Sequence, residues 1–367
     1  MLVNIVTGCS LLLILLYAIL IISYIHGFCK VARQSSCSGG KKSVSVIVPF
    51  HNESGNIRKT LESILGQETG ADFEVIAVDD HSTDDSRQVV EKIMQADSRL
   101  RLVSSTLHGK KSALADGIKL ARYDVVATAD ADCFYPKQWL DAMSATYEKS
   151  ECMLLAGPVK IGDAGSWFGK FQYADFASLV GSGIGAMGCG HPIMCNGANL
   201  MFSKRIFESF DNPYNTEYVS GDDVFLLHKV KSVGGKICFT AQNETIALTS
   251  AMPTIRNFMR QRIRWGGKTT GYRDADSLLV AFLVASVSML ICCGLFLLPI
   301  SAKPLLCAYL PKLFVDTLFL MAICKRLGGR HLLWWMPVFE LMVCIYTATV
   351  AMVSLVCKKG KRNHNIA

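Results

Sequence analysis

Residues 123–132 read YDVVATADAD, an apolar run that ends in two aspartates separated by one alanine. Val125, Val126 and their neighbours suit a strand that is covered on both faces of a sheet. Asp130 and Asp132 therefore stand at the end of a buried strand. Two negative charges at such a position predict a binding site for a positively charged group, which other parts of the chain must complete.

Short apolar runs alternate with helical patterns between about residue 43 and residue 250. The runs that predict strands are 43–50, 73–80, 99–105 and 123–132, and the patterns that predict helices are 56–67, 82–97 and 110–122. Repeated strand and helix units predict a parallel sheet with helices on both faces, whose ligands bind at the carboxyl ends of the strands. The helix of 82–97 is expected to be capped by Ser82 or Thr83.

The second and fourth predicted strands both end in paired acids. Asp79 and Asp80 close the second strand, as Asp130 and Asp132 close the fourth. Two acidic tips at one sheet edge would repel each other unless a cation lay between them. Mg²⁺ or Mn²⁺ prefers carboxylate oxygens and is usually held by one or two of them together with phosphate and water. The pattern predicts a metal that carries a phosphorylated ligand.

The first apolar segment, residues 1–29, contains no Asp, Glu, Lys or Arg. It is as long as a bilayer-spanning helix of about 20 residues and lacks the basic start and cleavage site of a signal peptide, so it predicts an uncleaved anchor. The positive residues that follow directly are Lys30, Arg33, Lys41 and Lys42. Because positive charge collects on the cytoplasmic side, residue 30 onward is expected in the cytosol.

The C-terminal region, residues 277–357, contains three further apolar segments. Residues 277–302 are free of charge, 304–324 are interrupted by Pro311, Lys312 and Asp316, and 332–357 contain Glu340. Three crossings would leave the basic tail of 358–367 outside, against the usual charge rule. Two to three C-terminal transmembrane helices are therefore predicted, with 304–324 the segment expected not to cross and the tail in the cytosol.

Composition narrows the class of protein. The chain has 367 residues, of which 51% are hydrophobic, and a net charge of +8 that fits a protein lying against anionic lipid and handling a phosphorylated substrate. The sequence contains no basic stripe with interleaved aromatic residues, so it does not predict a nucleic-acid partner. The 14 cysteines show no paired metal-binding spacing, so they are expected to be reduced and structural in the cytosol.

Six motifs occur in a fixed order between about residues 43 and 268. They are SVIVPFHNE, VDDHSTDDS, GKKSALADGI, ATADADC, SGDDVFLLH and QRIRW. In order and spacing they resemble the inverting family 2 glycosyltransferases of the GT-A fold, in the membrane-anchored branch with cellulose synthase, hyaluronan synthase and ceramide glucosyltransferase. The resemblance implies a Rossmann-like α/β domain over 43–250 that binds a nucleotide sugar, then an amphipathic interfacial segment over 251–276.

The resemblance implies a role for each motif on the donor side. Asp79 and Asp80 would receive the nucleobase and ribose, with uracil the favoured base, and Lys110 would contact the base or the diphosphate. Asp132 would hold the metal, and Asp130 would contact the metal and the ribose or phosphate. The QRIRW motif supplies Gln261, Arg264 and Trp265. Arg264 would suit the diphosphate, and Trp265 would suit a sugar face or the acceptor.

On the acceptor side the resemblance places the catalytic base at Asp223, which would take the proton from the acceptor hydroxyl. Asp222 stands where many relatives have Glu, so the assignment between the two neighbours stays open. Asn196 and Gly197 would lie close to the acceptor sugar. Gln172 and Asp175 lie near a family position that usually holds Glu.

The expected function is a single, metal-dependent and inverting transfer of a sugar from a nucleotide sugar to a lipid or lipid-linked acceptor in the membrane. The alternatives are a processive polysaccharide synthase and a non-catalytic subunit that binds nucleotide sugars. A transporter is disfavoured, because Lys312, Asp316 and Glu340 are too few charges to line a route. Compactness favours a bacterial inner membrane over the membranes of the endoplasmic reticulum or Golgi.

Overall fold

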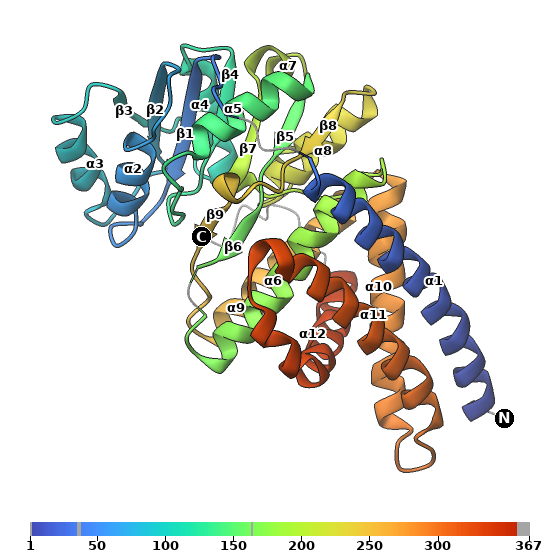
Figure 1. Ribbon diagram of the computed structural model, residues 1–367. Coiled ribbons are helices and arrows are strands. Elements are labelled where there is room, and N and C mark those ends of the chain that lie inside the picture. Colours follow the sequence, from blue (N-terminus) through green and yellow to red (C-terminus); the bar gives the residue numbers. More distant parts are fainter. Residues whose placement is uncertain (1, 35–37, 163, 358–367) are drawn as a thin grey trace.

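The computed structural model describes residues 2–34, 38–162 and 164–357, so the basic tail predicted for 358–367 lies outside it. An α/β domain sits at one end of a group of long helices (Figure 1). The main sheet has seven strands in the order β3-β2-β1-β4-β7-β5-β8, and β6 pairs with β9 in a small second sheet.

The strands are β1 Val44–Phe50, β2 Phe73–Asp79, β3 Leu100–Ser104, β4 Val125–Thr128, β5 Leu154–Ala156, β6 Val159–Ile161, β7 Leu200–Ser203, β8 Ile237–Phe239 and β9 Ala247–Thr249. The helices of the α/β domain are α2 Ile57–Leu65, α3 Ser86–Met94, α4 Lys110–Leu120, α5 Trp139–Ser150, α6 Trp167–Gly188, α7 Lys204–Glu208, α8 Asp222–Ser232 and α9 Ile255–Gly267. The long apolar helices are α1 Leu2–Ala32, α10 Ala275–Phe296, α11 Lys303–Leu327 and α12 Met336–Cys357, and the 3-10 turns are η1 Gly197–Asn199, η2 Asn243–Thr245, η3 Lys268–Gly271 and η4 Arg330–Trp335.

The predicted α/β architecture is confirmed, because β1 to β4 form a parallel group. Every residue of β1 and of β2 is buried, as expected for strands with helices on both faces. The sheet is nevertheless mixed, since β7 runs antiparallel to both β4 and β5. The predicted parallel sheet thus covers β1 to β4, and β7 departs from it, although β5 and β8 pair in parallel again.

The start of α3 also differs from the prediction. The helix begins at Ser86, after Asp85, and not at Ser82 or Thr83. The N–H groups of those two residues are already bound, one to the carboxylate of Asp79 at 2.9 Å and one to the side chain of Asn52 at 2.7 Å. These bonds hold residues 82–85 in a turn, so the helix begins only at Ser86.

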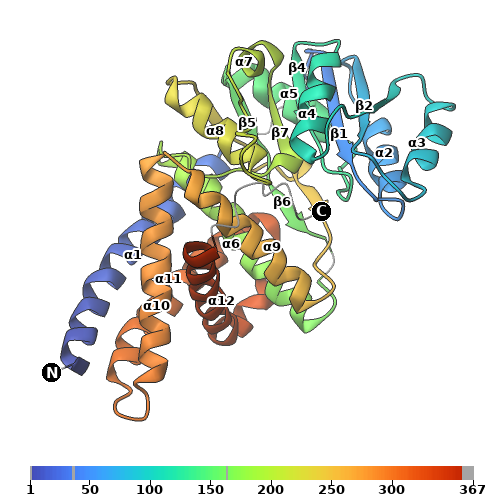
Figure 2. The same cartoon turned by 180° about the vertical axis from the view of Figure 1, so that it is seen from behind.

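Four helical segments among the described residues are long and apolar enough to cross a membrane. They are Ser10–Ala32, Ala275–Phe296, Lys303–Leu327 and Arg330–Ser354. In both views α1, α10 and α11 extend from the α/β domain on the same side (Figures 1 and 2). The one N-terminal and three C-terminal candidates agree with the predicted arrangement.

Helix α6 joins the two parts of the molecule. It belongs to the predicted 43–250 domain, yet it packs against both α1 and α11. A Cβ atom added to Gly188 would lie 2.2 Å from the carbonyl oxygen of Gly27, and one added to Gly181 would lie 2.2 Å from Ile323. Only glycine permits helices to approach this closely, so α6 fixes the α/β domain on the helical bundle.

The charges of the segment expected not to cross are paired inside the bundle. Helix α11 is continuous through Pro311. The ammonium group of Lys312 contacts Asp316 at 2.6 Å and also contacts Glu340 of α12, while the hydroxyl of Tyr17 on α1 donates to Asp316 at 2.8 Å. All four side chains are buried. These contacts explain how α11 accommodates its charges, and they leave no reason to exclude it from the membrane.

The last helix turns back toward the α/β domain. Near its start, Pro337 accepts a hydrogen bond from Tyr309, in the half of α11 remote from the domain. Near its end, Val350 and Ser354 lie 2.5 and 2.9 Å from the position of a Cβ atom added to Gly266 of α9. The segment formed by η4 and α12 begins next to the end of α11 that contacts α6, and it ends next to α9. Both of its ends therefore lie on the side of the α/β domain.

This return predicts the topology of the C-terminus. In sealed vesicles an epitope appended to the C-terminus should show the same protease accessibility as the α/β domain, and an epitope at the N-terminus should show the opposite accessibility. A C-terminal epitope that behaved like the N-terminal one would mean that α12 crosses the membrane completely.

Candidate active site

A cavity of about 290 Å³ opens at the carboxyl ends of the strands, beside α6 and α9. The predicted site residues that line it are Lys110, Asp130, Asp132, Gln172, Asn196, Gly197, Asp222, Asp223, Gln261, Arg264 and Trp265. Residues from four of the six motifs, from α6 and from the loop of Asn196 and Gly197 thus meet around one space. Its apolar wall is formed largely by Phe176, Leu179 and Val180 of α6.

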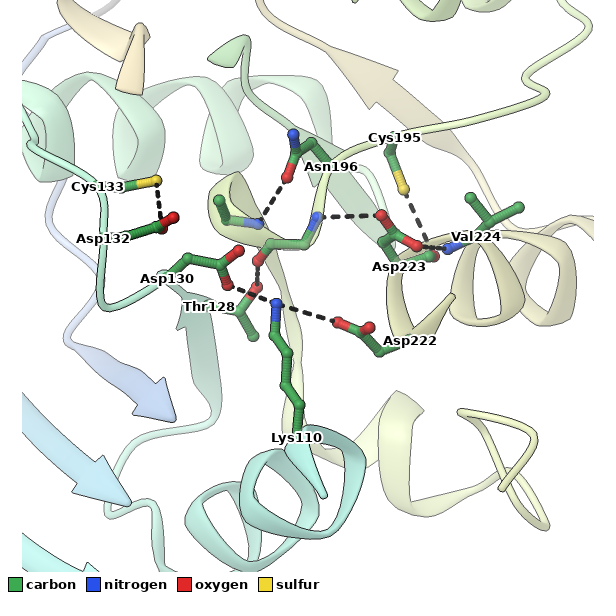
Figure 3. A network of polar contacts seen from close by, with 12 residues as sticks. Lys110, Thr128, Asp130, Asp132, Cys133, Cys195, Asn196, Asp222, Asp223 and Val224 are labelled. Carbon is green, nitrogen blue, oxygen red and sulfur yellow. Dashed lines mark hydrogen bonds and ion pairs between the residues drawn. The ribbon is translucent and has the colours of Figure 1, made fainter. Parts of the chain in front are cut away.

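Lys110 joins the carboxylates that follow β4 to those that open α8. It is the first residue of α4, and its ammonium group lies 2.6 Å from Asp130 and 3.8 Å from Asp222 (Figure 3). Asp130 follows β4 by two residues, whereas Asp222 opens α8. One lysine therefore partly neutralises carboxylates that the sequence separates by about ninety residues.

The acid pair of α8 packs against the loop that carries Asn196 and Gly197. The N–H of Gly197 donates to Asp223 at 3.4 Å. A Cβ atom at Gly197 would lie only 2.8 Å from the Asp222 carboxylate. Glycine is needed here for the close approach of the Asp222 side chain, while the contact with an acceptor sugar stays a prediction.

Lys268, in the turn η3 after α9, contacts Asp223 at 3.4 Å. Lys268 was not among the predicted site residues, because it lies three residues beyond the QRIRW motif and belongs to no motif of its own. Burial by itself would raise the pKa of Asp223, but Lys268 and the N–H of Val224 outweigh it and hold that pKa below its ordinary value. Asp223 is therefore an ionised carboxylate at neutral pH.

The neighbouring acids behave differently. Burial raises the pKa of Asp222, and the charge of Asp223 adds to the rise. Burial also raises the pKa of Asp130, where Asp132 adds to the effect and Lys110 opposes it. Within the acid pair of α8, these opposite shifts favour Asp223 over Asp222 as the proton acceptor at neutral pH.

The cavity fits a divalent metal by its donor atoms. Four carboxylates line it, from Asp130, Asp132, Asp222 and Asp223, together with four cationic side chains, from Lys110, Arg262, Arg264 and Lys268. Asp130 and Asp132 offer the oxygen atoms that Mg²⁺ and Mn²⁺ prefer.

Asp79 and Asp80 are not among the residues that line this cavity. They lie one loop away at the end of β2, where Asp79 forms an ion pair with Arg87 at 3.3 Å. Asp80 accepts a hydrogen bond of 2.7 Å from the N–H of Gly109, directly before Lys110. Their predicted contacts with the base and ribose therefore stay predictions, although the ends of β2 and β4 lie at the same edge of the sheet.

Asp175 and Gln172, on α6, have distinct partners. Gln172 lines the cavity. Its side-chain amide accepts a hydrogen bond from the N–H of Met252 at 2.8 Å and donates one to the carbonyl oxygen of Met252 at 3.0 Å. Asp175 is buried and accepts hydrogen bonds from Tyr346 of α12 and from Arg262 of α9. The Arg262 guanidinium lies over the ring of Trp265 at 4.5 Å. Asp175 thus links a long apolar helix to the helix that supplies Gln261, Arg264 and Trp265.

Comparisons with known proteins agree with this geometry. The structure superimposes on a mannosyltransferase from Pyrobaculum calidifontis, determined in complex with GDP-Man and Mn²⁺, with a TM-score of 0.57 and 16% identity over 97% of this chain and 98% of that one. The fold is that of the GT-A glycosyltransferases. Residues 45–210 match the model of glycosyl transferase family 2, so the chain carries a family 2 glycosyltransferase domain.

Two curated relatives are similar over part of their length. The glycosyltransferase AglE of Haloferax volcanii is 25% identical over 199 residues, which are 53% of this chain and 64% of AglE. The poly-beta-1,6-N-acetyl-D-glucosamine synthase of Staphylococcus epidermidis is 24% identical over 235 residues, which are 63% of this chain and 56% of the synthase. The chain thus spans less than two thirds of either relative.

The contact between Lys268 and Asp223 predicts the pH dependence of activity. Because the pKa of Asp223 is depressed, its carboxylate stays charged as the pH falls below the ordinary aspartate range. In Lys268→Met the acidic limb of the kcat/KM profile should move to higher pH, by about one unit or more. Lys268→Arg should keep the limb near its original position, and an unchanged limb in Lys268→Met would show that the two groups are not coupled.

The buried ion pair predicts a large loss of stability. Asp175→Asn leaves the Arg262 charge without its partner and should lower the free energy of unfolding by about 3–5 kcal/mol, seen as a lower Tm in detergent. The double variant Asp175→Leu with Arg262→Met should recover much of that loss, because no charge is left buried. Equal Tm values for Asp175→Asn and the unchanged protein would contradict the pairing.

Proposed function

We propose that the chain transfers a single sugar from a nucleotide sugar to a lipid or lipid-linked acceptor, with inversion at the anomeric carbon. One observation carries the proposal: the acids of the donor end and the base Asp223 face one cavity whose apolar wall is α6. Helix α6 also packs on α1 and α11. An acceptor with its hydrocarbon chain in the membrane would reach the acids along this wall.

The donor is proposed to be a nucleoside diphosphate sugar, with UDP favoured from the family resemblance. Asp130 and Asp132 would hold Mg²⁺ or Mn²⁺, which would offset the negative charge that develops on the leaving diphosphate. The mannosyltransferase with the same fold was crystallised with a nucleotide sugar and Mn²⁺, which supports this assignment. Lys110 and Arg264 lie on the same cavity and would bind the diphosphate as well.

Asp223 would act as the general base. It would take the proton of the acceptor hydroxyl as that oxygen attacks the anomeric carbon. The bond between the carbon and the diphosphate breaks on the opposite face, so the configuration inverts and the nucleoside diphosphate leaves. Trp265 would hold a sugar face, while Asn196 and Gly197 would border the acceptor.

Single transfer is preferred to processive synthesis because of the contacts between the long helices. A processive enzyme needs a route for a hydrated sugar chain through its membrane helices. The polar groups that lie between α1, α11 and α12, namely Tyr17, Lys312, Asp316 and Glu340, are buried and bind one another. In the described part of the bundle these groups stabilise packing rather than line a path. The same contacts also disfavour a transporter.

The location is proposed as an integral membrane protein with its α/β domain in the cytosol, in a bacterial inner membrane. The cations Lys30 and Arg33 at the domain end of α1 support the orientation. Nucleotide sugars, as soluble and charged donors, would then reach the cavity directly from the cytosol.

The decisive experiment measures release of nucleoside diphosphate by the purified chain with UDP- or GDP-sugars, Mn²⁺ or Mg²⁺, and total membrane lipid. Asp223→Asn should lower kcat by about 10²–10⁴ fold while nucleotide binding is retained, because the fold and the metal site stay intact. Asp132→Asn should instead weaken the metal dependence and nucleotide affinity together.

The matched control is Asp124→Asn, an aspartate at the opposite end of β4 that bonds Ser203 and lies outside the cavity. It should leave release unchanged. Nucleotide binding without lipid-dependent release, in the unchanged protein, would favour the non-catalytic subunit. A long homopolymer made from one nucleotide sugar would favour the processive synthase.

A further inference from the structure

A second group of metal-ligating side chains lies beside the donor end of the cavity. Asp80 and His81 follow β2, and His108 lies in the loop before α4. One ligand atom from each of the three residues lies within 4.8 Å of the others. The two imidazole rings approach to 3.9 Å between their centroids, with an angle of 34° between their planes.

The backbone around this group is fixed by several contacts. The buried carboxylate of Asp80 accepts the N–H of Gly109 at 2.7 Å, which holds the two loops together. The ring nitrogen Nδ1 of His51 lies 2.6 Å from the carbonyl oxygen of Asp80. His81 has a φ of 57°, a left-handed conformation that residues other than glycine seldom adopt. The two loops therefore present their histidines from a set position.

The ligand types select a particular class of metal. Two imidazoles and one carboxylate suit Zn²⁺ and similar borderline ions, whereas Mg²⁺ prefers oxygen ligands such as those of Asp130 and Asp132. In a tetrahedral zinc site the ligand atoms lie about 3.4 Å apart, given bonds of about 2.0–2.2 Å. His81 and His108 are exposed, so side-chain rotation can provide the approach that is needed, which is at most about 1.4 Å.

We propose that Asp80, His81 and His108 bind a borderline divalent cation such as Zn²⁺, at a site separate from the carboxylate pair of Asp130 and Asp132. Three protein ligands leave a fourth position open to solvent. The site joins the loop after β2 to the loop before α4, and α3 and β3 lie between these two loops in the chain. A bound ion would therefore hold the two loops together.

The position of the site gives it a consequence for the donor. Gly109, whose N–H binds Asp80, directly precedes Lys110, which contacts Asp130. Asp80 is also the residue assigned to the donor base and ribose. A carboxylate bound to Zn²⁺ can no longer accept a hydrogen bond from the base, so the ion would compete with the donor. This consequence rests on the proposed function, whereas the metal site itself does not.

The first test uses Co²⁺ as a visible probe of the zinc site, on the purified full chain in detergent with excess Mg²⁺ to occupy the carboxylate pair. We expect one equivalent of Co²⁺ with the intense absorption of a four- or five-coordinate ion, displaced by Zn²⁺. His81→Ala and His108→Ala should each weaken binding roughly tenfold or more, and the exposed histidine variant His331→Ala should not.

Co²⁺ binding of equal strength in the His81 and His108 variants would overturn the site. The weak absorption of a hexa-aqua-like ion would overturn it as well. Both histidines are exposed side chains, so neither variant is expected to prevent folding, and an unchanged Tm checks that point.

The second test measures UDP binding by calorimetry in Mg²⁺, with and without Zn²⁺. The apparent Kd for UDP should rise roughly tenfold or more with Zn²⁺ in the unchanged protein and stay constant in His108→Ala. Zn²⁺ that binds without any effect on UDP would overturn the competition. A chain that binds Co²⁺ as expected but no nucleotide in Mg²⁺ alone would contradict the proposed function and support the metal site.

Discussion

The buried carboxylate of Asp175 is the contact on which the active-site geometry depends. It lies on α6 and binds Arg262 of α9 and Tyr346 of α12 at once. A charge taken out of water this completely is stable only with its partners in place. The position of α9, and with it Arg264 and Trp265, is therefore tied through Asp175 to α6 of the α/β domain and, through Tyr346, to α12 of the long apolar bundle.

The first half of the domain could be predicted from sequence because its signals are local. A buried strand such as β4 shows an unbroken apolar run, and the acids at its end mark the edge where ligands bind. Motif order then identified the residues of the cavity, although Asp130 and Asp223 lie far apart in the chain. Asp79 and Asp80 were predicted for the same edge, and the structure places them in the neighbouring loop, outside the cavity lining.

The remaining features depend on contacts between distant segments, which no local pattern reveals. The direction of β7 follows from pairing with β4 and β5, and not from its own four residues. Lys268 acquires its role only because η3 brings it to Asp223. In the sequence the charges of α11 look like an interruption of a membrane helix. Their partners, Glu340 for Lys312 and Tyr17 for Asp316, lie in other segments, so the local pattern does not show the pairing. The return of α12 was hidden for the same reason.

Charge balance connects these observations to catalysis. Four carboxylates in one cavity would repel one another and would be expensive to bury, so the chain places a lysine at each end of the group. Lys110 stands between Asp130 and Asp222, and Lys268 stands against Asp223. Arg262 and Arg264 line the same cavity and add further positive charge. Lys268 and the N–H of Val224 keep the pKa of Asp223 below its ordinary value, so this carboxylate stays ionised. Under the proposed function a divalent cation would bind at Asp130 and Asp132, so metal binding and proton acceptance would use different carboxylates.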